Sequence, residues 1–359
     1  MTNKLNWQPE ELPLSIDVET RAVLKRLPKA HAALAELKGI ASTIPNQVIL
    51  INTLGLQEAK DSSAIENIIT THDDLYKSGL NLETVKSLSA KEVQNYIRAL
   101  KAGFELVSET GLLTNTTVLK IQEILEDNKA GFRALPGTVL RSSDTGETIY
   151  TPPQDIEVIN RLMSNLERFI NDTSVSDMDP LVKMAIIHFQ FESIHPFYDG
   201  NGRTGRIMNI LYLILQNLQN LPVLYLSSYI IRSKPEYYRL LQYIRETNNW
   251  EEWILYMVEG IEQTSVETIG LIRDMKELML NFKNRLRDNY KFYSQDLLNN
   301  LFKHPYTKIE FIVNDLNVSR ITAANYLNKL AEDGLIRKEK LGTGNYYINE
   351  QLFELLSRR

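Results

Sequence analysis

The stretch His195-Pro196-Phe197-Tyr198-Asp199-Gly200-Asn201-Gly202-Arg203-Thr204-Gly205-Arg206 joins two apolar segments and decides how the centre of the chain folds. Residues 180–194 before it are mostly apolar, which predicts a helix buried on most sides. Pro196 disfavours helical geometry at His195, so this helix should end there. Apolar residues recur at helical spacing from 207 to 214, so a second helix should begin near Asn201.

The start of the second helix lies inside this stretch and is suited to bind an anion. Its first amide groups have no partner in the helix, and Gly200 and Gly202 allow close approach of a phosphate. Arg203 and Arg206 project from the same first turn. Asp199 can hold a Mg²⁺ that bridges phosphate oxygens, and His195 can act as a general base.

Two simpler interpretations concern single pieces of this stretch. Residues 199–202 alone would be an ordinary turn, and the neighbouring charged groups argue against that interpretation. A zinc site made from His188, His195 and Asp199 is the metal alternative, but its spacing is not that of the helical His pair in H-E-x-x-H. His188 alone reads as a core histidine on an apolar helix.

The complete stretch resembles the signature of the Fic family, His-x-Phe-x-Asp/Glu-Gly-Asn-Gly-Arg-x-x-Arg, and contains every fixed position of it. The resemblance implies transfer of AMP from ATP to a hydroxyl side chain of a protein, with Mg²⁺ as cofactor. His195 would then be the base and Asp199 the metal ligand. Residues 200–202 would form the anion hole, Arg203 and Arg206 would hold the β- and γ-phosphates, and Thr204 and Gly205 belong to the same nucleotide-binding segment.

A second match, Ser62-Ser63-Ala64-Ile65-Glu66-Asn67, resembles the inhibitory motif of that family, Ser/Thr-x-x-x-Glu-Gly/Asn. The resemblance implies that Glu66, with Ser62 and Asn67 in the motif, blocks the γ-phosphate site. Ser63 and Glu66 are also spaced as a capping box that opens a helix, and the two interpretations are compatible. Ser89 to Glu92 shows the same spacing and predicts the start of another helix.

Two further segments are assigned by the same resemblance. Residues 131–153 break helical periodicity and suggest a short hairpin, similar to the flap on which this family docks its target, with Thr148, Ile149 and Tyr150 in the docking strand. The alternative is an ordinary surface loop. Tyr237 and Tyr238 resemble residues on the adenine side of the nucleotide, although spacing alone would also fit simple packing.

Composition limits the class of protein. The chain has 359 residues, 43% of them hydrophobic and 24% charged, which fits a globular protein with a sizeable core. It has no cysteine, which excludes disulfides and thiolate catalysis and suggests the cytoplasm. A net charge of −5 gives no overall signal for nucleic acid or membrane, and no apolar run is long enough to span a bilayer.

The pattern of elements predicts a mainly α chain with four parts. These are an N-terminal helical region over 1–110 with the inhibitory helix, a catalytic core over 111–260, a connecting helix over 261–289, and a winged helix-turn-helix over 290–359. Residues 319–331 would be the recognition helix of the last part. Its ten Lys and Arg against eight Asp and Glu leave DNA and protein both open as partners.

The favoured function is therefore an AMP transferase that acts on a protein hydroxyl, that Glu66 inhibits and that also modifies itself. One rival is removal of AMP from a modified protein, with Glu66 positioning the water. A second rival is a DNA-binding regulator whose nucleotide site only senses its ligand. A homodimer is left open.

Overall fold

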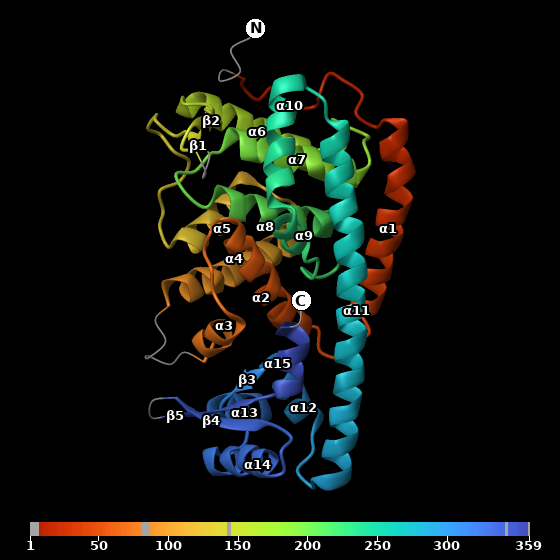
Figure 1. Cartoon of the computed structure of the whole chain (residues 1–359), viewed down its shortest axis with the longest axis vertical. Helices are drawn as coiled ribbons and strands as arrows, with labels where there is room; N and C mark the ends of the chain where they lie inside the picture. The colour runs from red at the N-terminus through yellow and green to blue at the C-terminus, as the bar shows by residue number, and fades with distance from the viewer. Residues whose placement is uncertain (1–6, 81–86, 142–144, 342–343, 358–359) are drawn as a thin grey trace.

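The computed structural model describes residues 7–80, 87–141, 145–341 and 344–357 and is dominated by helices, which confirms the mainly α class (Figure 1). Two long helices lie side by side along one flank, α1 (Arg21–Ala41) and α11 (Glu251–Asn289). The catalytic stretch lies in the upper half of the view, and the C-terminal elements lie at the bottom.

Three more helices complete the N-terminal region: α2 (Val48–Ile65), α3 (His72–Ser78) and α4 (Leu88–Thr110). The capping-box interpretation of Ser63 and Glu66 is wrong, because α2 ends at Ile65 and Glu66 is its C-cap. The predicted cap at Ser89 is also wrong. Ser87 caps α4 by accepting a hydrogen bond from the Ala90 amide, so Ser89 and Glu92 both lie within the helix.

The central part contains six helices and one hairpin within the described residues. They are α5 (Asn115–Glu126), β1 (Leu140–Arg141), β2 (Thr148–Tyr150), α6 (Ile156–Asn171), α7 (Pro180–Ile194), α8 (Asn201–Leu215), α9 (Leu226–Arg232) and α10 (Lys234–Thr247). Helices α7 and α8 begin and end as their sequence predicts. Nearly all of α7 is buried, as its mostly apolar sequence requires.

Helix α11 begins at Glu251, not at residue 261, so it joins the core and the predicted connecting helix in one element. Its inner face is buried, and α1 packs along it. The aromatic rings of Trp253 and Tyr256 on this face contact Tyr237 of α10. None of the helices in the described part of the chain has the length and apolar character that a membrane span requires.

After α11, the chain forms α12 (Gln295–Lys303), β3 (Tyr306–Thr307), α13 (Ile309–Leu316), α14 (Arg320–Glu332), β4 (Arg337–Leu341), β5 (Gly344–Ile348) and α15 (Glu350–Ser357). The three strands form an antiparallel sheet in the order β3-β5-β4. Three helices followed by a hairpin match the predicted order, while β3 and α15 were not predicted. The assignment as a winged helix stays a prediction.

Candidate active site

The loop between α7 and α8 places the predicted catalytic residues at one corner of the helical core. His195 follows α7 with a left-handed backbone, φ 49° and ψ 58°, which turns the chain sharply out of the helix. Gly200 precedes α8 with φ 79°, a conformation that glycine adopts without strain. The two reversals fold residues 195–200 back toward the start of α8.

Arg133 anchors this loop from the base of the flap. Its side chain is 1% exposed. Its Nε donates to the His195 carbonyl at 2.8 Å, its Nη2 contacts the Ile194 and Pro153 carbonyls, and its backbone amide donates to the Pro196 carbonyl at 2.8 Å. A guanidinium at the carboxyl end of α7 also complements the helix dipole. Sequence reasoning gave Arg133 no role, since nothing local indicates these distant partners.

Asn201 closes the loop from the other side. Its Oδ1 accepts from the Phe197 amide and its Nδ2 donates to the Phe197 carbonyl, both at 2.9 Å. The residue is 3% exposed. Its side chain therefore braces the loop, while its backbone amide belongs to the open first turn of α8.

The first turn of α8 offers amide groups to a ligand. The amides of residues 201–203 have no intrahelical acceptor because they lie in the first turn, and Gly200 has no side chain that could cap them. The Asp199 carboxylate accepts from the Gly200 amide at 2.7 Å. Such a helix start favours an anion such as a phosphate. Thr204 and Gly205 continue the turn inward, and a Cβ at Gly205 would lie 2.8 Å from Glu192 of α7, so glycine permits this close packing.

Glu66 lies over this helix start and pairs with Arg206, as the resemblance implies. Arg206 is 3% exposed, and its Nη2 lies 2.8 Å from Glu66 Oε1. Ser62 holds the same guanidinium, accepting from Nε at its hydroxyl, 2.7 Å, and from Nη2 at its carbonyl, 2.9 Å. A Cβ at Gly202 would collide with the Glu66 carboxylate. The carboxylate therefore occupies space above the predicted anion hole.

Charge keeps Glu66 ionised in this position. Burial opposes ionisation, but the Arg206 guanidinium outweighs it and lowers the pKa of Glu66 below its ordinary value. Asn67, the last residue of the motif, adopts φ 63°, and its Oδ1 accepts from Lys234 Nζ at 3.0 Å. The end of α2 is thus tied both to α8 and to the start of α10.

Arg203 is also paired with carboxylates, which the sequence did not indicate. Its Nη1 lies 3.0 Å from Glu92 of α4 and its Nη2 lies 2.8 Å from Glu126 of α5. Its side chain is 4% exposed. A Cβ at Gly200 would lie 2.6 Å from Glu126 Oε1, so this carboxylate lies against the loop. Both arginines of the motif are thus paired with carboxylates of the protein in the structure.

The surroundings of His195 favour the neutral imidazole. Burial and the nearby Arg133 guanidinium lower the pKa of His195 to about 4. Its Nδ1 is buried and has no hydrogen-bond partner within the described residues. A neutral ring is the form that can accept a proton from a hydroxyl.

The zinc alternative does not form. His188 is buried in the core, and burial lowers its pKa to about 3. Its ring nitrogens contact the Tyr237 hydroxyl at 2.8 Å and the Asn209 side chain at 3.1 Å. Over the described ranges, no group of three His, Cys, Asp or Glu side chains could hold a metal. Asp199 is exposed, which fits an ion whose other ligands are water and substrate oxygens.

The tyrosine pair on α10 divides between core and surface. Tyr237 is 1% exposed and packs against Trp253, whereas Tyr238 is 44% exposed. Burial of the hydroxyl is the largest cause of the raised pKa of Tyr238, and the charges of Glu66 and Arg206 also act on this group. The adenine-side assignment stays a prediction, and Tyr238 is the member with an open surface.

Glu192 is a buried carboxylate near the site that sequence reasoning missed. Its Oε1 has no hydrogen-bond partner within the described residues, and burial raises its pKa to about 7. The Arg206 guanidinium opposes that rise. Its place three residues before His195 was visible in the sequence, but an acid on an apolar helix carries no distinctive signal of its own.

The predicted flap forms a hairpin in which Leu140 pairs with Tyr150 and Arg141 with Thr148. Tyr150 is 1% exposed, and its hydroxyl donates to the Ser193 carbonyl at 2.8 Å. Ile149 is 39% exposed. Tyr150 therefore anchors the hairpin to α7, and Thr148 and Ile149 remain for contact with a target, which stays a prediction.

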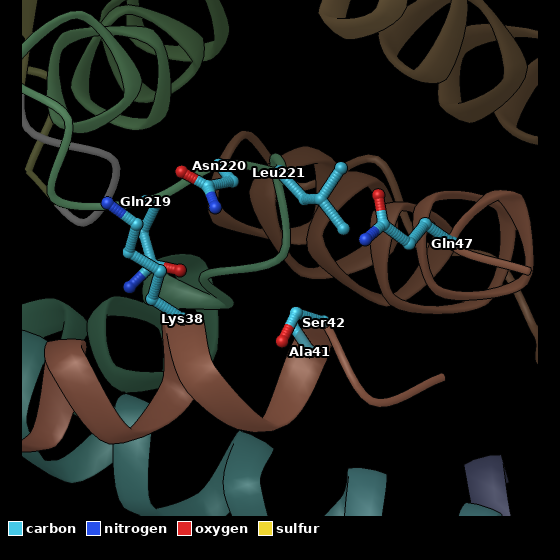
Figure 2. Close-up of a pocket in the computed structure, with 7 residues that line it drawn as sticks. All are labelled: Lys38, Ala41, Ser42, Gln47, Gln219, Asn220 and Leu221. Carbon is cyan, nitrogen blue, oxygen red and sulfur yellow. The ribbon is translucent and has the colours of Figure 1, made fainter. Parts of the chain in front are cut away.

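Figure 2 shows a small pocket outside this site. Lys38, Ala41 and Ser42 of the end of α1 line it, together with Gln47 and residues 219–221 after α8. The Oε1 of Gln219 is buried there without a hydrogen-bond partner in the described structure. None of these residues belongs to the motif.

Three family matches follow one another along the chain. Residues 24–105 match the Fic/DOC family N-terminal domain, and residues 112–213 match the Fic/DOC family. Residues 278–352 match the C-terminal domain described as protein adenylyltransferase SoFic-like. The matched ranges include residues 62–67, residues 195–206 and the C-terminal sheet.

Curated relatives match somewhat more than a third of the chain. A protein adenylyltransferase fic-1 from Caenorhabditis elegans is 27% identical over 129 residues, 36% of this chain and 24% of the relative. A protein adenylyltransferase Fic from Drosophila melanogaster is 28% identical over 138 residues, 37% and 27% of the two chains. The chain thus matches about a quarter of the length of these relatives.

Solved structures show the same fold. A Fic family protein from Desulfovibrio desulfuricans superposes with a TM-score of 0.61 at 19% identity, covering 95% of this chain and 98% of that one. Fic-1 from Caenorhabditis elegans gives a TM-score of 0.53 at 19% identity, covering 69% and 71%.

We expect Asn201→Ala to lower the free energy of unfolding by about 2–4 kcal/mol, because it leaves the buried amide and carbonyl of Phe197 unpaired. Urea denaturation measures this change. Asn289→Ala is the control: Asn289 is exposed and bonds only to its own helix, so it should change stability by less than about 0.5 kcal/mol. Equal effects of the two substitutions would contradict the bracing role.

Proposed function

The chain belongs to the Fic family, and on this premise we propose that it transfers AMP from ATP to a Ser, Thr or Tyr hydroxyl of a protein. The observation that carries the proposal is the convergence of His195, Asp199 and the open start of α8 in one loop. His195 takes the hydroxyl proton, the oxygen attacks the α-phosphorus, and the bond to pyrophosphate breaks. A Ser, Thr or Tyr hydroxyl of the chain itself could be modified by the same reaction.

Mg²⁺ is part of this proposal. The exposed Asp199 carboxylate beside the open amides of α8 suits an ion bound through one carboxylate and substrate phosphates. When bound, the ion would neutralise charge on the phosphates during transfer. The amides of residues 201–203 and Arg206 supply the protein's own share of that neutralisation.

We further propose that Glu66 inhibits transfer. A buried guanidinium is a strong partner for either a carboxylate or a phosphate. While Glu66 occupies Arg206, the γ-phosphate of ATP lacks this partner, so the nucleotide is turned from its productive pose. We favour inhibition over the rival reaction, removal of AMP with Glu66 positioning a water, because Glu66 pairs with the arginine proposed to hold the γ-phosphate.

The role of His195 has a direct test in the Glu66→Gly background, where inhibition is removed. Adding His195→Ala should reduce transfer of labelled AMP by ~10²- to 10⁴-fold with ATP binding nearly unchanged, because a general base acts on the chemical step. With a pKa near 4, His195 stays neutral above about pH 5, so the rate should not fall on acidification through pH 6.5. Undiminished transfer by the alanine variant would remove His195 from the mechanism.

Control by Glu66 is tested by substitution of each partner. We expect Glu66→Gly to increase AMP incorporation, including self-modification, since it frees Arg206 for the γ-phosphate. Adding Arg206→Ala should cancel the gain, because both substitutions act on one interaction. Labelled AMP on protein and the melting temperature are measured together. Lower transfer by a folded Glu66→Gly variant, with AMP removal also lost, would favour the rival reaction.

For the C-terminal segment we favour contact with protein over contact with DNA. Four basic side chains of this segment, which would have to contact the phosphates of a bound duplex, have partners within the fold. Arg320 pairs with Glu310, Lys329 with Asp333, Arg337 with Glu350, and Lys338 donates to Asn328. DNA binding relies on cations that are free to neutralise phosphates, and these are already neutralised or engaged.

We therefore expect the full chain to show no measurable binding to duplex DNA at 0.15 M salt, where non-specific complexes of weakly basic surfaces dissociate. Fluorescence anisotropy of a labelled duplex, repeated at several salt concentrations, measures this. Tight binding that falls steeply with salt, and that Arg320→Ala and Lys338→Ala both weaken, would instead support the DNA-binding regulator.

A further inference from the structure

The inhibitory helix α2 lies between the catalytic core and the C-terminal elements, and two consecutive residues in the middle of this helix contact the two sides. Gln57 contacts the C-terminal side and Glu58 the core side. Both are 2% exposed. Ser62 and Glu66, which hold Arg206, follow within the next helical turns. Figure 1 shows α2 passing from the centre of the molecule down to α15.

On the core side, Glu58 fixes α2 to α9 and α4. Its carboxylate accepts from the Ser227 amide at 3.0 Å and hydroxyl at 2.5 Å, and from the Tyr96 hydroxyl at 3.2 Å. These partners satisfy a carboxylate that would otherwise be costly to bury. These hydrogen bonds set the distance of α2 from the core. At this distance Ser62 and Glu66 reach the guanidinium of Arg206.

On the C-terminal side, Gln57 joins three elements. Its Nε2 donates to the Leu356 carbonyl of α15 at 2.9 Å, and its Oε1 lies 2.8 Å from His72 Nε2 at the start of α3. Helix α12 also packs against α2. A buried amide with both of its polar atoms bonded is specific in direction, so it fixes α2 relative to α3 and α15.

Helix α3, which follows the inhibitory turn, is held by the same C-terminal elements. The Tyr306 hydroxyl of β3 donates to Asp73 Oδ1 at 2.7 Å. The Tyr76 ring lies 5.5 Å from the Tyr306 ring and 5.9 Å from the Phe353 ring, and Lys308 donates to the Leu80 carbonyl at 2.7 Å. The C-terminal elements thus contact the chain both before Glu66, at Gln57, and after it, in α3.

We propose that residues 295–357 act as an inhibitory clamp on α2 and α3, so that the position of the C-terminal elements sets how firmly Glu66 blocks Arg206. The proposal rests on AMP transfer and its inhibition by Glu66. Glu66 itself is the residue at which α2 ends, and helix ends open readily unless tertiary contacts hold them. The clamp supplies those contacts at a distance from the nucleotide site.

The test loosens the clamp without touching the site. Gln57→Ala removes the bonds to Leu356 and to His72, and Tyr306→Phe removes only the bond to Asp73 while it keeps the ring. Gln219→Ala and Tyr347→Phe are matched controls. Gln219 is a buried glutamine that donates to the Leu34 carbonyl, and the Tyr347 hydroxyl donates to Asn328 inside the C-terminal part.

Two quantities are measured for each variant: the initial rate of AMP transfer, and hydrogen exchange of the amides of residues 62–66. Losing one hydrogen bond commonly shifts such an equilibrium by ~2- to 10-fold. We expect gains of this size in both quantities for Gln57→Ala and Tyr306→Phe, and no change for the controls. In the Glu66→Gly background, the same substitutions should add nothing to transfer, because the inhibitory carboxylate is already absent.

Each outcome separates the clamp from the proposed function. If Glu66→Gly shows no AMP transfer at all, the proposed function fails, and hydrogen exchange still tests the clamp. If Glu66→Gly is active but the clamp variants behave like their controls, the clamp is wrong. A rate gain from Gln57→Ala that persists in the Glu66→Gly background would also overturn it. Melting temperatures verify that each variant is folded. If Gln57→Ala does not fold, Tyr306→Phe alone tests the clamp.

Discussion

The buried guanidinium of Arg206 needs an anion, and the arrangement around the loop follows from that need. A cation with 3% exposure is costly unless it is paired and hydrogen-bonded. Ser62 and Glu66 meet this requirement in the structure, and a nucleotide phosphate could meet it in their place. In the proposed function, two ligands of similar charge compete for one cation, so the contact that pairs Arg206 in the fold would also control access of the nucleotide to the site.

Several elements near the site were predictable because their signals are local. The apolar run of residues 180–194 and the Pro196 that follows it define α7, and Gly200 with the periodic residues after it defines α8. Proline, glycine and helical periodicity act over a few residues, so one sequence suffices to detect them. The roles of His195 and Asp199 were inferred from their place in this loop and stay predictions.

The ion pairs were harder to predict, and the two Ser-x-x-Glu patterns show why. Both resemble capping boxes, yet neither opens a helix: one lies at the end of α2 and the other inside α4. Their glutamates, Glu66 and Glu92, instead pair with Arg206 and Arg203. Spacing describes a helical turn equally well at its start, middle or end, and only the tertiary fold decides which distant cation a carboxylate meets. Arg133 and Glu126 were missed for the same reason.

Helix α11 gives the C-terminal elements a fixed geometry. Its 39 residues correspond to a rod about 58 Å long, and α1 braces it along one flank. A continuous helix resists bending and stretching, so the parts at its two ends cannot slide past each other along its axis. The connection from Tyr290 to Ser294, between α11 and α12, is the nearest pivot. Separation of the C-terminal elements from α2 by a swing about this connection would also have to part α12 and α15 from α11, against which both pack.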